Sequence, residues 1–126
     1  MNPTTALLLQ GILHCAERDE EVPLYKVLAF FDYVNHSLPT YQEFKESMQR
    51  AINLGLIEIR DGDVQPSISF KIWRESKPDS LNLHQERNEL TQFLSYQPKL
   101  DAKPVFVLVT EREYQDALEM YHRKKE

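Results

Sequence analysis

The sequence has one cysteine, Cys15, and only three glycines among its 126 residues. A single thiol forms no internal disulfide and fits the reducing cytoplasm. The glycines, at positions 11, 55 and 62, are too far apart to build a phosphate-cradling loop. No apolar run reaches the roughly 18 residues that a membrane-spanning helix needs. These scarcities disfavour a disulfide scaffold, a nucleotide-loop enzyme and a membrane protein.

An apolar segment near the start, TTALLLQGILHCA at residues 4–16, could be mistaken for an export signal. It lacks the basic stretch that precedes the apolar part of such a signal. His14 also stands directly before the cysteine, where a lipoprotein signal has a small residue. We therefore expect this segment to form a buried helix in a cytoplasmic protein.

Basic charge is scarce in both halves of the chain. Fifteen basic residues against 20 acidic residues give a formal net charge of -5. Residues 1–74 hold 7 basic and 10 acidic side chains, and residues 75–126 hold 8 and 10. Neither half is basic enough to attract phosphate groups strongly, which counts against general nucleic-acid binding.

Side chains that carry catalytic or metal chemistry are dispersed along the sequence. The four histidines, at positions 14, 36, 84 and 122, show no H-x-x-x-H spacing, so we predict no metal site and expect each to be a surface or capping residue. Cys15 lies in an apolar helix, where a thiol is ordinarily inert, and His14 points about 100° away around that helix. We predict a protein that is not an enzyme and has no cofactor.

The first half of the sequence predicts three helices and a hairpin. Prolines open helices at about residues 3–18 and 23–34. A T-x-x-E capping box opens a third helix at residues 40–54, and Gly55 is suited to end it in the left-handed conformation. The segment LIEIRDGDVQP, at residues 56–66, indicates two short strands around an Asp-Gly turn.

The second half is less uniform. Residues 67–75 alternate as a strand would, but Ser67 could also cap a short helix, and we favour the helix. A further helix is predicted at about 81–94, and VFVLV at 105–109 indicates a strand covered on both faces. A second capping box at Thr110 opens a closing helix. The predicted fold class is α+β, mainly helical, with residues 1–126 forming a single domain.

Three helices followed by a hairpin resemble the winged-helix form of the helix-turn-helix superfamily. The resemblance covers residues 4–66 and depends on the order of the elements and on TYQEFKESMQRAINLGLI at residues 40–57. Residues 67–126 are then a C-terminal helix–strand–helix extension. Many winged helices place the third helix in the DNA major groove, whereas others are protein-interaction modules.

A DNA-binding regulator is the alternative function that the resemblance implies. Its contacts would come from the third helix and the wing, through Thr40, Gln42, Gln49, Arg50, Asn53 and Arg60. The outward face of that helix, however, has two carboxylates, Glu43 and Glu46, for one guanidinium. Two aspartates also outnumber Arg60 at the hairpin tip, and phosphates repel such groups. We favour a solvated helix face, with Glu46 and Arg50 forming a surface pair.

The second helix carries an apolar strip on its other side, formed by Ala29, Phe30 and Tyr33. The C-terminal helices could cover this strip, or a protein partner could. Together with Phe106 and Leu108 of the predicted strand, it is our candidate interface for a partner or for a second copy of the chain. The favoured function is therefore a non-catalytic protein-interaction or regulatory module.

Overall fold

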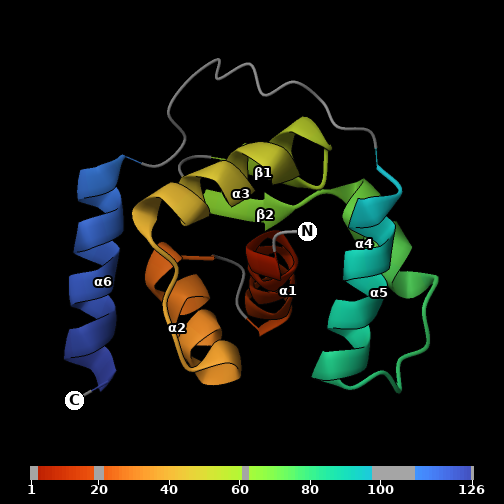
Figure 1. Cartoon of the computed structure of the whole chain (residues 1–126), viewed down its shortest axis with the longest axis horizontal. Coiled ribbons are helices and arrows are strands. Elements are labelled where there is room, and N and C mark those ends of the chain that lie inside the picture. The colour runs from red at the N-terminus through yellow and green to blue at the C-terminus, as the bar shows by residue number, and fades with distance from the viewer. Residues whose placement is uncertain (1–2, 19–21, 61–62, 98–109, 126) are drawn as a thin grey trace.

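The computed structural model describes residues 3–18, 22–60, 63–97 and 110–125. Within these ranges the chain is mainly helical, with one small antiparallel sheet of two strands (Figure 1). The elements are α1 (Pro3–Arg18), α2 (Leu24–Asn35), α3 (Tyr41–Asn53), β1 (Ile57–Arg60), β2 (Asp63–Pro66), α4 (Ile68–Glu75), α5 (Leu83–Ser95) and α6 (Glu111–Lys125).

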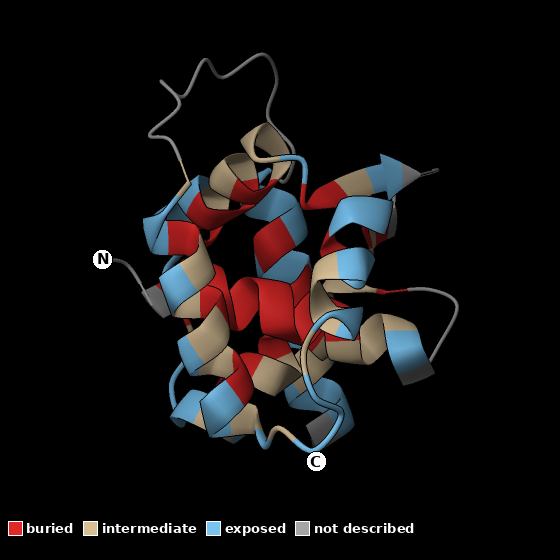
Figure 2. Ribbon diagram, turned by 90° about the vertical axis from the view of Figure 1, so that its right-hand side faces the viewer, coloured by how far each residue is buried: buried red, intermediate tan, exposed pale blue. Residues whose placement is uncertain are grey.

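Helix α1 lies at the centre of the fold. Every residue from 4 to 13 is buried, and α1 contacts α2, α3, β2 and α5. Figure 2 shows the buried residues gathered in the middle of the molecule. A helix buried on all sides must give partners to its polar side chains, and the Thr5 hydroxyl donates to the Ser47 hydroxyl of α3 (3.2 Å). The predicted buried helix at the start of the chain is confirmed.

Local signals set the bounds of α3. The predicted capping box is present, because Glu43 N donates to Thr40 Oγ1 (3.1 Å) and Thr40 N donates to Glu43 Oε1 (3.0 Å). Phe44 and Met48 are fully buried on its inner face. Gly55 follows the helix with a φ of 70°, a left-handed conformation that glycine adopts without strain. The chain therefore turns directly into the hairpin.

The strands β1 and β2 pair with Ile57 opposite Pro66 and Ile59 opposite Val64. The predicted turn at residues 61–62 lies outside the described residues. After β2 the chain forms α4, because the Ser67 hydroxyl caps the helix by accepting from Phe70 N (3.2 Å). The favoured helix at residues 67–75 is thus confirmed over the strand.

Helices α5 and α6 flank this core. A capping box of Asn82 and Gln85 opens α5, and the predicted one of Thr110 and Glu113 precedes α6. Helix α6 packs along α2, at the left of Figure 1. The strand predicted at 105–109 lies outside the described residues, and so do Phe106 and Leu108. In the part of the chain that the structure describes, no helix has both the length and the apolar character to cross a membrane.

Candidate functional site

Polar side chains on the outward face of α3 form hydrogen bonds with one another. Gln42 Nε2 donates to Glu46 Oε1 (2.8 Å), and Gln49 Nε2 donates to Asn53 Oδ1 (3.0 Å). Thr40 is exposed, but its hydroxyl already caps the helix. The amide groups that would read base edges are therefore engaged with neighbouring side chains one turn away.

Arg50 serves the packing of α3 against α5. Its Nη2 atom donates to the carbonyl oxygen of Leu94 (3.2 Å), at the C-terminal end of α5, and its side chain is half-buried. The last turn of α5 has no basic residue of its own, so Arg50 supplies the positive charge that favours a helix C-terminus. The expected surface pair with Glu46 is wrong, because Glu46 accepts from Gln42 instead. Arg60 ends β1, and its side chain lies outside the described part.

The apolar strip of α2 divides into two environments. Phe30 is half-buried and its ring stacks on His14 of α1, with centroids 5.8 Å apart. Gly11 permits this approach, since a Cβ at that position would lie 3.1 Å from the Phe30 ring. Ala29 is half-buried, whereas Tyr33 is 75% exposed. Tyr33 is therefore the residue of the strip that a partner could reach most easily.

Helix α6 covers the region where α2 meets the start of α3. The buried Tyr114 hydroxyl donates to the carbonyl of Pro39, and its ring contacts the rings of Tyr41 and Phe44. Burial, followed by the nearby Glu43 carboxylate, raises the pKa of Tyr114 above its ordinary value, so this hydroxyl stays protonated and donates. The N-terminal turn of α3, which a DNA-reading helix points at the bases, therefore has α6 beside it.

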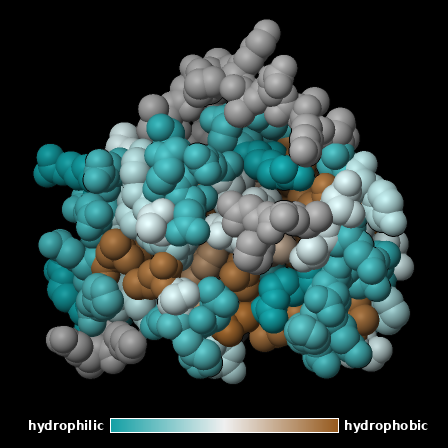
Figure 3. Space-filling model, viewed as in Figure 1, coloured by the Kyte–Doolittle hydropathy of each residue, from teal (hydrophilic) through white to brown (hydrophobic). Residues whose placement is uncertain are grey.

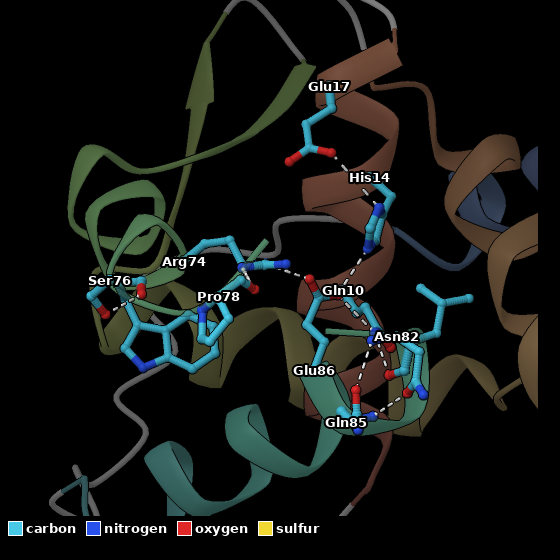
Figure 4. Close-up of polar contacts among 11 residues, drawn as sticks. Gln10, His14, Glu17, Arg74, Ser76, Pro78, Asn82, Gln85 and Glu86 are labelled. Carbon is cyan, nitrogen blue, oxygen red and sulfur yellow. Dashed lines mark hydrogen bonds and ion pairs between the residues drawn. The ribbon is translucent and has the colours of Figure 1, made fainter. Parts of the chain in front are cut away.

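A buried carboxylate joins α1, α4 and α5. Glu86 of α5 is 2% exposed and lies against Gln10, His14 and Arg74 (Figure 4). Gln10 Nε2 donates to Glu86 Oε1 (2.8 Å), and His14 Nε2 lies 2.8 Å from the same oxygen. Arg74 Nε donates to Glu86 Oε2 (2.5 Å). Both carboxylate oxygens are thus paired, as a buried charge requires.

This arrangement fixes the charges of the group. Burial raises the pKa of Glu86, but hydrogen bonds from His14, Gln10 and Arg74 outweigh burial and lower the pKa to about 2. The hydrogen bond to Glu86 in turn raises the pKa of His14 above its ordinary value of 6.5. A negative carboxylate therefore lies between an arginine and a histidine whose protonated form it favours.

The cluster around Glu86 was not predicted, and the expectation that His14 is a surface or capping residue is wrong. One signal was available. Leu83, Glu86, Leu90 and Leu94 recur at helical spacing, so Glu86 occupies a position where the pattern requires an apolar side chain. Gln10 and His14 stand four residues apart within the apolar helix α1, which is the complementary signal.

Neither a metal site in the described part of the chain nor a related protein assigns a function to these residues. Among the described residues, no group of three or more histidine, cysteine, aspartate or glutamate side chains could hold a metal ion. Comparison of the chain with protein-family models, with curated proteins and with solved structures gave no match.

Proposed function

We propose that this chain is a non-catalytic protein-interaction module of the winged-helix type, and that it binds another protein or a second copy of itself. The order of three helices followed by a hairpin, with a capping box at the start of the third helix, supports the winged-helix assignment. The cluster around Glu86 supports a non-catalytic role, because both carboxylate oxygens are bonded to side chains of the fold itself.

One observation carries the preference for protein over DNA. Arg50 supplies the guanidinium of α3, and it binds the Leu94 carbonyl of α5. Removing it from that carbonyl to reach a phosphate would leave the end of α5 without its cation. The face that remains has the carboxylates of Glu43 and Glu46, which DNA phosphates repel.

The candidate interface centres on Tyr33. Apolar side chains reach the surface along the borders of α2 with α6 and with α1, between polar side chains (Figure 3). Tyr33 is 75% exposed, and a tyrosine combines a large apolar ring with a hydroxyl that accepts or donates. Aromatic side chains of this kind are common anchors of protein interfaces.

A salt titration separates this proposal from DNA binding. Fluorescence anisotropy of mixed-sequence duplex DNA is measured with increasing protein at several salt concentrations. We expect no saturable binding, even at low salt. Binding whose log–log salt slope is roughly -0.9 per phosphate contact would contradict the proposal and support a DNA-binding regulator.

Light scattering tests self-association through Tyr33. We expect the mass of the wild-type protein to rise toward twice the monomer as its concentration increases, and Tyr33→Ser to remain a monomer. Tyr96→Ser is the matched control, since Tyr96, at the end of α5, is a tyrosine that is 85% exposed, slightly more than Tyr33. A monomer mass for the wild type at every concentration removes the dimer and leaves a different protein as the partner.

A further inference from the structure

A pocket of ≈ 440 Å³ lies between α1, β2 and α4. Its apolar lining comes from Leu13 and Ala16 of α1 and from Pro66 of β2. This volume is within the range of pockets that hold small molecules. The apolar residues offer a surface for one short hydrocarbon group. The charged residues around them determine which charged groups a ligand needs.

The charged lining has two groups of each sign. Lys71 and Arg74 of α4 are positive, and Glu17 of α1 and Glu75 of α4 are negative. Arg74 already pairs with Glu86, and Glu17 lies 3.8 Å from His14 Nδ1. Lys71 and Glu75 form no ion pair with any residue that the structure describes, although they stand four apart on α4. Lysine before glutamate is the weaker order for such a pair. Both charges are therefore available to a ligand.

Arg74 connects the pocket to the buried cluster. Its Nε atom binds Glu86, and its Nη1 atom donates to the carbonyl of Pro78 (3.2 Å). Nη2 makes no hydrogen bond to a described residue, so it remains as a donor at a fixed position. An arginine held in place by a buried carboxylate loses little conformational freedom when it binds an anion.

A ligand that carries both charges can pair with the positive and the negative groups of this lining, whereas a ligand with a single charge leaves one set without a counterpart. We propose that the pocket binds a small zwitterion with a branched apolar group, of the α-amino acid class. Its carboxylate lies between Lys71 and the remaining donor of Arg74, its ammonium faces Glu75, and its hydrocarbon group covers Leu13. The site is separate from the interface around Tyr33, so either proposal can fail alone.

L-Leucine is the probe that tests this site. Binding is measured by titration calorimetry and by the fluorescence of Trp73, the single tryptophan, which directly precedes Arg74. We expect saturable binding at millimolar concentration or below. N-acetyl-leucine, which lacks the ammonium, and leucinamide, which lacks the carboxylate, should each bind roughly tenfold more weakly or worse. Equal binding of either capped compound, or no binding of leucine, overturns the proposal.

Single substitutions of charged residues test the site and supply its controls. Lys71→Ala and Glu75→Ala should each weaken leucine binding by roughly tenfold without lowering stability, because both side chains are exposed. Lys45→Ala and Glu46→Ala, on α3, change the same charges at positions that do not line the pocket and should leave the affinity as it is. Equal effects of the two pairs would show a general charge effect and overturn the assignment.

Discussion

Glu86 is a charged side chain in the interior of the protein. The side chains that pair with its carboxylate come from two other helices. Gln10 and His14 hold one of its oxygens from α1, and Arg74 holds the other from α4. A buried ion pair adds little to the stability of a fold compared with apolar side chains of the same shape. Loss of one partner is far more costly, because the remaining charges stay buried without compensation.

Replacement of Glu86 by glutamine should therefore destabilise the protein by about 3 kcal/mol or more. Glu89→Gln is the matched control on the same helix. Glu89 pairs with Lys77 at 3.2 Å, but it is 39% exposed, so its loss should cost less than about 1 kcal/mol. Urea unfolding of both variants measures the difference. Equal losses would mean that the cluster around Glu86 does not hold the three helices together.

The pKa values of the same cluster predict how stability depends on pH. His14 has a raised pKa when folded, so its contribution is complete below 6.5 and declines as the pH rises through the folded value. Glu86 has a lowered pKa, so its contribution is complete above 4.5 and is lost as the pH falls toward about 2. The cluster therefore stabilises the fold most between these limits.

Unfolding free energies at about pH 5.5 and about pH 8.5 test this dependence. The difference between the wild type and His14→Gln should be larger at the lower pH. His84→Gln serves as the control, because His84 is exposed and its side chain hydrogen-bonds, among the described residues, to Asn88 alone (3.4 Å). A difference between wild type and His14→Gln that is constant across this range would contradict the assigned protonation of His14.

The partners of Glu86 could not be found from local patterns. Gln10 and His14 are 76 and 72 positions away in the sequence, so only the packing of α1 against α5 brings them together. A glutamate in a helix ordinarily indicates a position that is exposed to solvent. Its position in the apolar stripe of α5 indicates burial, but a stripe does not identify which residue supplies the opposite charge.

At the scale of single elements, the ends of helices could be predicted well because their signals are local. The capping box at Thr40 and the cap at Ser67 each depend on a hydrogen bond between residues that are three positions apart in the sequence. Exposure was harder to infer, since Ile68 and Ile72 of α4 are 67% and 60% exposed although they are apolar. The two isoleucines are exposed because α4 turns Phe70 toward the core instead.

Gly55 joins α3 to the hairpin, and its replacement tests that junction. Its φ is 70° and no atom lies within 4 Å of a Cβ built there, so the cost of a side chain is conformational, not steric. Gly55→Ala should lower stability by about 1 kcal/mol. Gly55→Asn should cost less, because asparagine tolerates the left-handed region. Thermal unfolding measures both, and an equal or reversed order would contradict the strain argument.

At the scale of the whole molecule, α6 is a peripheral element on a core that the other helices complete. It contributes only Tyr114 and Ala117 to the buried apolar residues that the structure describes. A helix attached by few buried side chains opens more readily than the elements at the centre. We expect α6 to separate from α2 without unfolding the remainder.

Hydrogen exchange of Tyr114→Ala tests this division. Amides of α6 should exchange faster by at least roughly tenfold, because the ring contacts with Tyr41 and Phe44 are lost, while amides of α1 keep their protection. Met120→Ala is the control on the same helix, since Met120 is 42% exposed. Faster exchange throughout the chain would show that α6 belongs to the same cooperative unit.

The burial of α1 on all sides also has a consequence for biosynthesis. Translation produces α1 before α2, α3, β2 and α5, which all pack against it. At ~5–20 residues per second, on the order of ten seconds pass between completion of α1 and completion of α5. The leucine-rich surface of α1 is incompletely covered during that interval, so we expect a nascent chain arrested before α5 to expose apolar side chains that the complete fold buries.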